Sequence, residues 1–146
     1  MTKPVVYFLC TGNSCRSQMA EGWARQLGQD QIVVYSAGIA PHGVNPRAVA
    51  VMQETGVDIA HHTSDPIDLD LLHRADYVIT LCGDADEACP VTPPHVTRLH
   101  WGLPDPARAV GSESEIMAKF REVRDNIHER VRHFLAEELG VAIPPL

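Results

Sequence analysis

The sequence predicts an α/β fold, a three-layer α/β/α sandwich around a central four-stranded parallel sheet. Short apolar runs alternate along the chain with segments whose apolar residues recur at helical spacing. Several of the runs are apolar throughout, as in strands that are buried on both faces. Alternating strands and helices favour right-handed crossovers, which make a sheet parallel and cover both of its faces. With 146 residues and no repeat or linker, the chain is expected to form a single domain, residues 1–146.

Four apolar runs are expected to be the strands. Residues 5–9 form the first, which stops at the turn-forming residues after Cys10. Residues 31–35 form the second, and residues 77–81 give a third buried pattern that ends on Cys82 and a glycine. A weaker fourth run covers residues 96–99.

Helices are expected between and after these strands. The first, residues 17–27, carries apolar side chains at helical spacing. The second, residues 45–56, begins with an Asn-Pro pair, and residues 68–74 form a short third helix. Residues 112–139 close the chain with one long apolar stripe. The residues that set these bounds are Gly28 and Gly56 as stops, Asn45 as a cap, and Ser112 with Glu115 as a capping box.

The charge balance excludes several partners. Twelve Lys and Arg residues against nineteen Asp and Glu residues give a net charge of −7, which opposes association with nucleic acid or an anionic membrane. No apolar run is long enough to span a membrane, and strand-like sequence at Pro4 leaves no room for a signal peptide. We therefore expect a cytoplasmic protein, monomeric by default, in which an anionic ligand needs a local positive site.

A cysteine and an arginine six residues apart flank the turn after the first strand. Backbone N–H groups of such a loop can wrap an oxyanion, Gly12 is expected to supply a left-handed turn, and Arg16 can bind two oxygens. The helix start and a hydroxyl from Ser17 favour a thiolate, which makes Cys10 the expected nucleophile. A buried strand-end cysteine beside a solvated arginine is the alternative, and Cys15 is expected to pack. The predicted oxyanion loop consists of Thr11, Gly12, Asn13, Ser14, Cys15, Arg16 and Ser17.

Two further cysteines, Cys82 and Cys89, lie in a polar segment after the third strand. Zinc binding with His95 and His100 is one interpretation, although their spacing is irregular for a structural site. Simple packing is another. A redox relay accounts better for the pair, because Cys82 could attack the sulfur of a Cys10 adduct and Cys89 could then take over the disulfide.

Several motifs, in order, resemble the thioredoxin-coupled arsenate reductases, which have the low-molecular-weight protein tyrosine phosphatase fold. The resemblance spans roughly residues 4 to 138. The matching motifs are residues 10–23 (CTGNSCRSQMAEGW), 35–38 (YSAG), 80–84 (TLCGD), 89–95 (CPVTPPH), 100–102 (HWG) and 105–108 (DPAR).

The resemblance implies a mechanism and partners. Cys10 attacks arsenate, Asp105 protonates the departing oxygen, and Cys82 then releases arsenite by forming a Cys10–Cys82 disulfide. Cys89 resolves this bond, and thioredoxin reduces the final Cys82–Cys89 disulfide. No tightly bound cofactor is implied. Some members hold a potassium ion, at positions that correspond here to Asn13, Glu21, Ser36 and Asp65, with His62 nearby.

Other functions stay open at this point. A low-molecular-weight phosphatase would use the same loop, and weak phosphatase activity is compatible with a reductase. A non-catalytic thiol module, either a redox sensor or an arsenite-binding protein, would bind without turnover. Glutaredoxin could replace thioredoxin as the reductant. The remaining histidines are assigned no chemistry, namely His42, His73, His128 and His133.

Overall fold

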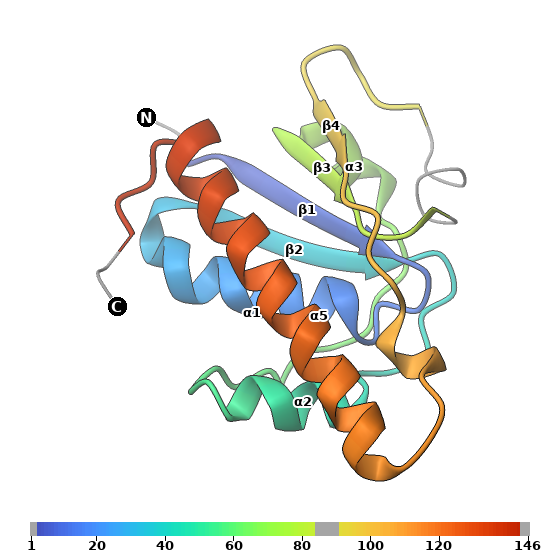
Figure 1. Cartoon of the computed structure of the whole chain (residues 1–146). Helices are drawn as coiled ribbons and strands as arrows, with labels where there is room; N and C mark the ends of the chain where they lie inside the picture. Colours follow the sequence, from blue (N-terminus) through green and yellow to red (C-terminus); the bar gives the residue numbers. More distant parts are fainter. Residues whose placement is uncertain (1–2, 84–90, 144–146) are drawn as a thin grey trace.

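The computed structural model describes residues 3–83 and 91–143, and its centre is a parallel sheet (Figure 1). The strands are β1 (Val5–Cys10), β2 (Val33–Gly38), β3 (Tyr77–Thr80) and β4 (Thr97–His100). Their order is β2-β1-β3-β4 and all three pairings are parallel. The predicted α/β class and the four-stranded parallel sheet are confirmed.

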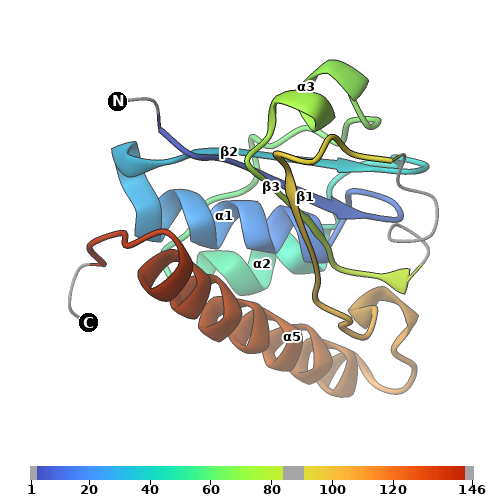
Figure 2. The ribbon, with the colours of Figure 1, turned by 90° about the horizontal axis from the view of Figure 1, so that it is seen from above.

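The helices cover the two faces of the sheet unequally. On one face lie α1 (Arg16–Gly28) and α5 (Glu113–His133), with α2 (Pro46–Gln53) packed against both (Figure 2). The short helix α3 (Leu69–Arg74) lies on the opposite face. Short helical turns follow at η1 (Gln29–Gln31), η2 (Pro106–Arg108) and η3 (Phe134–Glu138). The predicted three layers are therefore present, and the α3 layer is the thinner one.

The inner position of β1 in the sheet explains why its sequence is apolar throughout. Alternate side chains enter opposite layers, and Val6 to Leu9 are all at most 1% exposed. The hydroxyl of Tyr7 accepts a hydrogen bond from the backbone N–H of Asp68, which caps α3. The ring of Phe8 lies 6.0 Å from that of Trp101, which in turn lies 5.8 Å from Phe134. Trp101 is thus a packing residue of the core.

Local capping sets the helix starts as the sequence predicted. The Asn45 side chain accepts from two N–H groups of α2, and Ser112 and Glu115 form the complete capping box of α5. The long helix is not regular to residue 139, because a π-helical turn, η3, begins at Phe134. No helix in the described ranges has the length and apolarity required to cross a bilayer.

Strand β2 lies later in the chain than predicted. The predicted strand ended at residue 35, yet residues 36–38 continue the ladder until Gly38 pairs with Cys10. A Cβ at Gly38 would lie 2.6 Å from the backbone nitrogen of Asn13 and 2.7 Å from the carbonyl oxygen of Thr11. The small residue is therefore required by the close approach of the loop after β1.

Candidate active site

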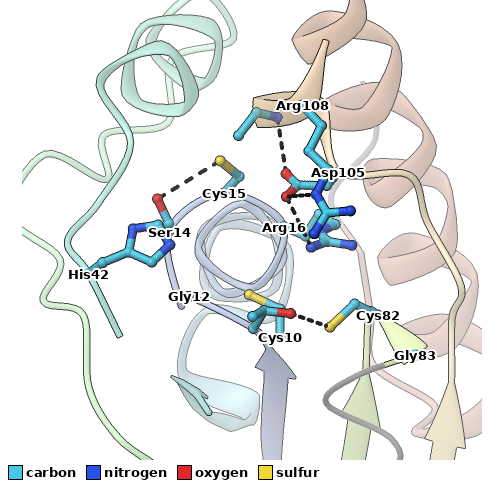
Figure 3. A pocket seen from close by; sticks show the side chains of 12 residues that line it. Cys10, Gly12, Ser14, Cys15, Arg16, His42, Cys82, Gly83, Asp105 and Arg108 are labelled. Atoms are coloured by element: carbon cyan, nitrogen blue, oxygen red, sulfur yellow. Dashed lines mark hydrogen bonds and ion pairs between the residues drawn. The ribbon is translucent and has the colours of Figure 1, made fainter. Parts of the chain in front are cut away.

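The carboxyl ends of β1 and β3 bring two cysteines to one cavity. Leu9 pairs with Thr80, so Cys10 and Cys82 both follow at the same edge of the sheet. The cavity there has a volume of about 390 Å³ (Figure 3). Its walls are formed by the loop after β1, by the segment before α2, by the end of β3 and by η2. The lining residues are Cys10, Thr11, Gly12, Ser14, Cys15, Arg16, His42, Cys82, Gly83, Asp105, Ala107 and Arg108.

The loop after β1 turns all of its carbonyl groups outward. The carbonyl oxygens of residues 10, 11, 12 and 14 accept hydrogen bonds from the backbone N–H groups of residues 39, 40, 42 and 45, at 2.9–3.2 Å. Those of Asn13 and Cys15 accept from the Gln18 side chain and from the Met19 N–H. No peptide bond in the described chain is cis. In a trans peptide the N–H points opposite to the preceding carbonyl, so the N–H groups of residues 11–16 face the interior of the loop.

These inward N–H groups have no acceptor within the described chain. None of the N–H groups of residues 11–15 donates a hydrogen bond to a described residue. The side chain of Arg16 adds another donor, because its Nε is buried and has no hydrogen-bond partner among the described residues. Its Nη1 donates to the carbonyl oxygen of Leu103 at 3.0 Å, which fixes the guanidinium. Buried donors are rarely left unpaired, so the arrangement indicates an anion site at a helix start.

The nucleophile predicted at Cys10 receives a directed hydrogen bond. Its Sγ lies 2.9 Å from the Oγ of Ser17. The Ser17 oxygen accepts from the side-chain amide of Asn13 at 2.8 Å, which leaves the Ser17 hydrogen to point at the sulfur. A hydroxyl that donates to sulfur stabilises the thiolate, which is the reactive form. The geometry therefore favours Cys10 as the nucleophile over a passive buried thiol.

The expected left-handed role of Gly12 is wrong, and Asn13 takes it. Asn13 has a φ of 46°, whereas Gly12 is absent from the described residues with positive φ. Asparagine tolerates this conformation because its short amide bonds to nearby groups. Gly12 lets the His42 ring pack directly against the loop, since a Cβ there would overlap the ring and the His42 side chain would have to move.

Cys82 is a buried thiol next to the loop. Its Sγ lies 3.1 Å from the hydroxyl oxygen of Thr11, a contact that the sequence did not reveal. Cys89 lies outside the described residues. The histidines of the zinc alternative have other partners: His95 Nε2 bonds to the carbonyl of His73 at 2.7 Å, and His100 Nδ1 to the hydroxyl of Thr80 at 2.8 Å. Within residues 3–83 and 91–143 no cluster of metal-ligating side chains is present.

Asp105 lies at the mouth of the cavity, between two arginines. Its Oδ1 accepts from the N–H of Ala107 at 3.0 Å, which caps η2 and fixes the carboxyl group. Its Oδ2 lies 3.6 Å from Nη2 of Arg16 and 3.9 Å from Nε of Arg108. Segments far apart in the sequence thus bring the predicted acid and the predicted nucleophile to one cavity (Figure 3).

Cys15 packs as expected and remains protonated. Burial raises the pKa of its thiol to about 12, and the nearby Asp105 carboxylate also raises it. The side chain is 2% exposed. A neutral thiol is a weak nucleophile, so Cys15 does not compete with Cys10 in the same loop.

The four residues of the potassium expectation come together only in part. Asn13 donates to Ser36 at 3.0 Å, and the Ser36 hydroxyl donates to Glu21 Oε1 at 2.6 Å. The other oxygen of Glu21 accepts from the Arg25 guanidinium at 2.9 Å. Asp65 joins through its backbone N–H, which donates to the Asn13 side-chain oxygen at 2.9 Å.

His62 lies next to this chain of hydrogen bonds. Its Nε2 is 3.6 Å from Glu21 Oε2, and its Nδ1 is 2.9 Å from the Gln18 side-chain oxygen. Burial lowers the pKa of His62 below its ordinary value, although the Glu21 carboxylate acts in the opposite direction. A mostly neutral imidazole therefore leaves Arg25 as the main positive charge beside Glu21.

Two ionisable residues of the cavity wall were not predicted from the sequence. His42 was assigned no chemistry, yet its ring packs against Gly12 on one side of the cavity. Arg108 was noted only as a residue after Asp-Pro, and it lines the opposite side (Figure 3). Neither position has a local sequence signal, because the cavity assembles from segments separated by about half the chain.

A thiol beside buried, unsatisfied donors at the carboxyl edge of a parallel sheet is the arrangement expected of an enzyme that attacks oxyanions with a cysteine. A family model for the low molecular weight phosphotyrosine protein phosphatases matches residues 5–142, and the chain belongs to this family. It is 62% identical to an arsenate reductase of Bacillus licheniformis over 92% of this chain and 96% of that protein.

Solved structures agree with this assignment. An arsenate reductase in a phosphate-binding state is 39% identical, covers 92% of this chain and 98% of that chain, and superimposes with a TM-score of 0.76. A thioredoxin-dependent arsenate reductase of Corynebacterium glutamicum is 28% identical with a TM-score of 0.77. That match covers 94% of this chain and 63% of the longer protein.

Proposed function

We propose that the protein reduces arsenate to arsenite through a thiol relay that starts at Cys10. One observation carries the proposal: the Nε of Arg16, unpaired among the residues that the structure describes, and the inward N–H groups of residues 11–15 surround a space beside the Cys10 thiol. A tetrahedral oxyanion matches these donors. The relatives named arsenate reductases, up to 62% identical, favour arsenate as that oxyanion.

In the first step, the Cys10 thiolate attacks arsenic and one oxygen leaves. Arg16 and the loop N–H groups hold the other oxygens. Asp105 donates a proton to the departing oxygen, which leaves as water, and a Cys10–arsenic bond remains. The fixed Oδ1 of Asp105 leaves Oδ2 as the proton-bearing atom, because Oδ1 already accepts the Ala107 N–H.

In the second step, Cys82 attacks the sulfur of Cys10. A Cys10–Cys82 disulfide forms while the sulfur–arsenic bond breaks, and its electron pair stays on arsenic, which becomes As(III) and leaves as arsenite. The contact of 3.1 Å between the Thr11 hydroxyl and the Cys82 sulfur supports this role, because once Cys82 is a thiolate the hydroxyl is the donor and stabilises it.

In the third step, Cys89 attacks the sulfur of Cys82 and frees Cys10 as a thiolate. The resulting Cys82–Cys89 disulfide takes two electrons from thioredoxin, which returns the three thiols. The thioredoxin-dependent relative from Corynebacterium glutamicum supports this reductant over glutaredoxin. The relay requires reduced thiols, which is consistent with a cytoplasmic protein. We propose a monomer with one domain, residues 1–146, as the working form.

The test is arsenate-dependent NADPH oxidation with thioredoxin and thioredoxin reductase. Wild type should turn over, whereas Cys10→Ser, Cys82→Ser and Cys89→Ser should each be reduced at least ~100-fold, because each removes a bond-forming sulfur. Cys15→Ser is the matched control and should stay within a few-fold of wild type. A parallel arm with glutaredoxin and glutathione identifies the reductant.

A phosphatase is the second candidate, because the family and the anion cradle are shared with phosphatases. Hydrolysis of 4-nitrophenyl phosphate through Cys10, without arsenate turnover in either arm, would overturn the reductase proposal. Slow hydrolysis together with arsenate turnover would be a side activity of the same nucleophile. Stoichiometric arsenite binding without turnover would instead indicate a thiol sensor.

A potassium ion near the loop is a separate part of the proposal. Asn13, Glu21, Ser36 and Asp65 offer oxygen donors of the kind that a hard cation prefers, and an ion there would supply positive charge next to Glu21. Arg25 already supplies such charge at 2.9 Å. We therefore propose weak potassium binding that strengthens when Arg25 is removed.

Initial rates in KCl and NaCl at equal ionic strength test this. The initial rate of the wild type should differ little between the two salts, whereas that of Arg25→Gln should be higher in KCl. Arg25→Lys retains the charge, so its rates should follow those of the wild type. Equal rates for Arg25→Gln in both salts would reject a potassium site.

A further inference from the structure

We propose that Arg108 is a specificity-determining residue that selects free tetrahedral oxyanions over their esters. The inference deepens the proposed function, because it concerns the same cavity. It starts from the contrast between the two arginines beside Asp105. The Arg16 side chain is 9% exposed and held by a hydrogen bond to Leu103, whereas that of Arg108 is 84% exposed.

Arg108 is held only loosely where it lies. Within the described chain, the one interaction of its guanidinium is the 3.9 Å ion pair with Asp105 Oδ2, which exceeds hydrogen-bond length. An exposed ion pair of this length contributes little free energy. The side chain can therefore move to an anion in the cavity without breaking a strong contact, and the backbone of η2 keeps it at the mouth.

The oxygen of the substrate that Arg108 can reach is the outgoing one. Once the loop N–H groups and Arg16 hold three oxygens of a tetrahedral anion, the fourth points away from Cys10 and toward Asp105, which protonates it. Arg108 Nε lies 3.9 Å from the Asp105 oxygen that faces this position. In a free oxyanion the fourth oxygen has no carbon substituent and shares the negative charge, so a guanidinium binds it by a charge-assisted hydrogen bond.

An ester places an organic group where this interaction would occur. Its fourth oxygen is bonded to carbon, carries less charge, and must extend past the long Arg108 side chain on its way out of the cavity. The same residue thus favours one ligand class and disfavours the other. The need for added positive charge is general in this chain, because its net charge of −7 repels a dianion at long range.

The experiment compares Arg108→Ala and Arg108→Lys with wild type, and Arg130→Ala on α5 serves as a matched loss of one exposed positive charge. Inorganic phosphate is the binding probe, titrated at low and high ionic strength. Arg108→Ala should bind phosphate ~3- to 10-fold more weakly, the effect of about 1 kcal/mol. The loss should shrink at high salt, and Arg108→Lys should recover most of the affinity.

Turnover gives the specificity readout. For Arg108→Ala, KM for arsenate should rise with kcat within about 2-fold, while kcat/KM for 4-nitrophenyl phosphate stays equal or increases. Phosphate affinity equal to wild type, or equal losses for arsenate and the ester, would overturn the inference. Arg108→Gln provides a second neutral variant if the alanine variant unfolds.

These results can be separated from the reductase proposal. If the wild type fails to reduce arsenate in both reductant arms, the proposed function fails, yet phosphate titration and ester hydrolysis still decide the role of Arg108. If the wild type reduces arsenate, and the Arg108 variants change neither phosphate affinity nor the preference for arsenate over 4-nitrophenyl phosphate, only the role of Arg108 is rejected.

Discussion

Asn13 shows how much of the site depends on one side chain. Its amide nitrogen donates to Ser17 and Ser36, and its amide oxygen accepts from the backbone of Asp65. Glu21 accepts at the far end of this chain and, as a carboxylate, has no proton to donate. The direction from Asn13 through Ser36 to Glu21 is therefore set, and Ser17, which accepts from the same amide, keeps its hydroxyl hydrogen for the Cys10 sulfur.

Gly38→Ala should disrupt the loop from the neighbouring strand. The new Cβ would lie 2.6–2.9 Å from backbone atoms of residues 11–13, which cannot move as a flexible side chain can. We expect a loss of ~1–3 kcal/mol of stability and at least ~10-fold weaker phosphate binding, measured by urea unfolding and titration.

Gly102→Ala is the control for this substitution, because its Cβ would meet only the end of the His100 side chain, at 3.3 Å. Equal phosphate affinity in Gly38→Ala and wild type would contradict the close approach described for Gly38.

Cys15 should make the folded protein sensitive to alkaline pH. Its pKa is about 12 in the folded state against an ordinary value of 9.0, so above pH 9 the unfolded chain loses this proton first and stability falls. Between pH 8 and pH 10 the wild type should lose about 1.4 kcal/mol relative to Cys15→Ala. Urea unfolding under reducing conditions measures this difference, and a constant difference would show that the thiol is not buried in the folded state.

At the level of elements, α2 is fastened to α5 by charge as well as by packing. Glu54, which ends α2, accepts hydrogen bonds from Arg121 and Arg124 of α5 at 2.8–3.2 Å. Arg47 near the start of α2 pairs with Glu113 at 2.7 Å. Because α2 follows the segment that binds the loop carbonyls, these pairs help to hold one wall of the cavity.

Glu54→Gln should remove a pH-dependent part of this attachment. Hydrogen bonds from Arg121 lower the pKa of Glu54 to about 2, so its contribution is present above the ordinary value of 4.5 and is lost as pH falls toward 2. The gap in unfolding temperature between wild type and Glu54→Gln should be largest near pH 6 and should narrow at pH 4.5 and 3.5.

Glu122→Gln is the comparison, because Glu122 pairs only with Lys119, at 3.4 Å, among the described residues. A difference in unfolding temperature between wild type and Glu54→Gln that stays constant with pH would mean that the ion pairs do not form in solution.

The elements differ in how well the sequence predicts them. Capping is local, so Asn45, Ser112 and Glu115 give the helix starts directly. The end of β2 and the exchange of roles between Gly12 and Asn13 depend on contacts between segments about 25 residues apart, which periodicity does not reveal. The cysteines and Arg16 were predictable because their chemistry is carried by residue type and spacing, whereas His42 and Arg108 join the cavity only through folding.

At the scale of the whole molecule, the unpaired donors of the loop link ligand binding to stability. A ligand that binds only the folded state stabilises it by about 2.7 kcal/mol at a concentration 100 times its Kd. Inorganic phosphate should therefore raise the unfolding temperature of wild type by several degrees.

Arg16→Ala should lose this stabilisation, and Arg130→Ala should retain it. Sulfate, another tetrahedral oxyanion, should act in the same direction as phosphate. An unfolding temperature that ignores phosphate in the wild type would show that the inward N–H groups do not form an anion site.

A cradle built from backbone N–H groups also determines where the enzyme must discriminate. Such donors contact only the oxygen atoms of a tetrahedral anion and make no contact with its central atom. Arsenate and phosphate therefore compete for the same donors, and in the proposed relay the choice between them falls to the later step in which the central atom accepts an electron pair. Phosphorus cannot accept the pair under these conditions, so phosphate occupies the site and leaves unchanged. The rate of arsenate reduction then follows the ratio of the two anions in solution rather than the concentration of arsenate alone.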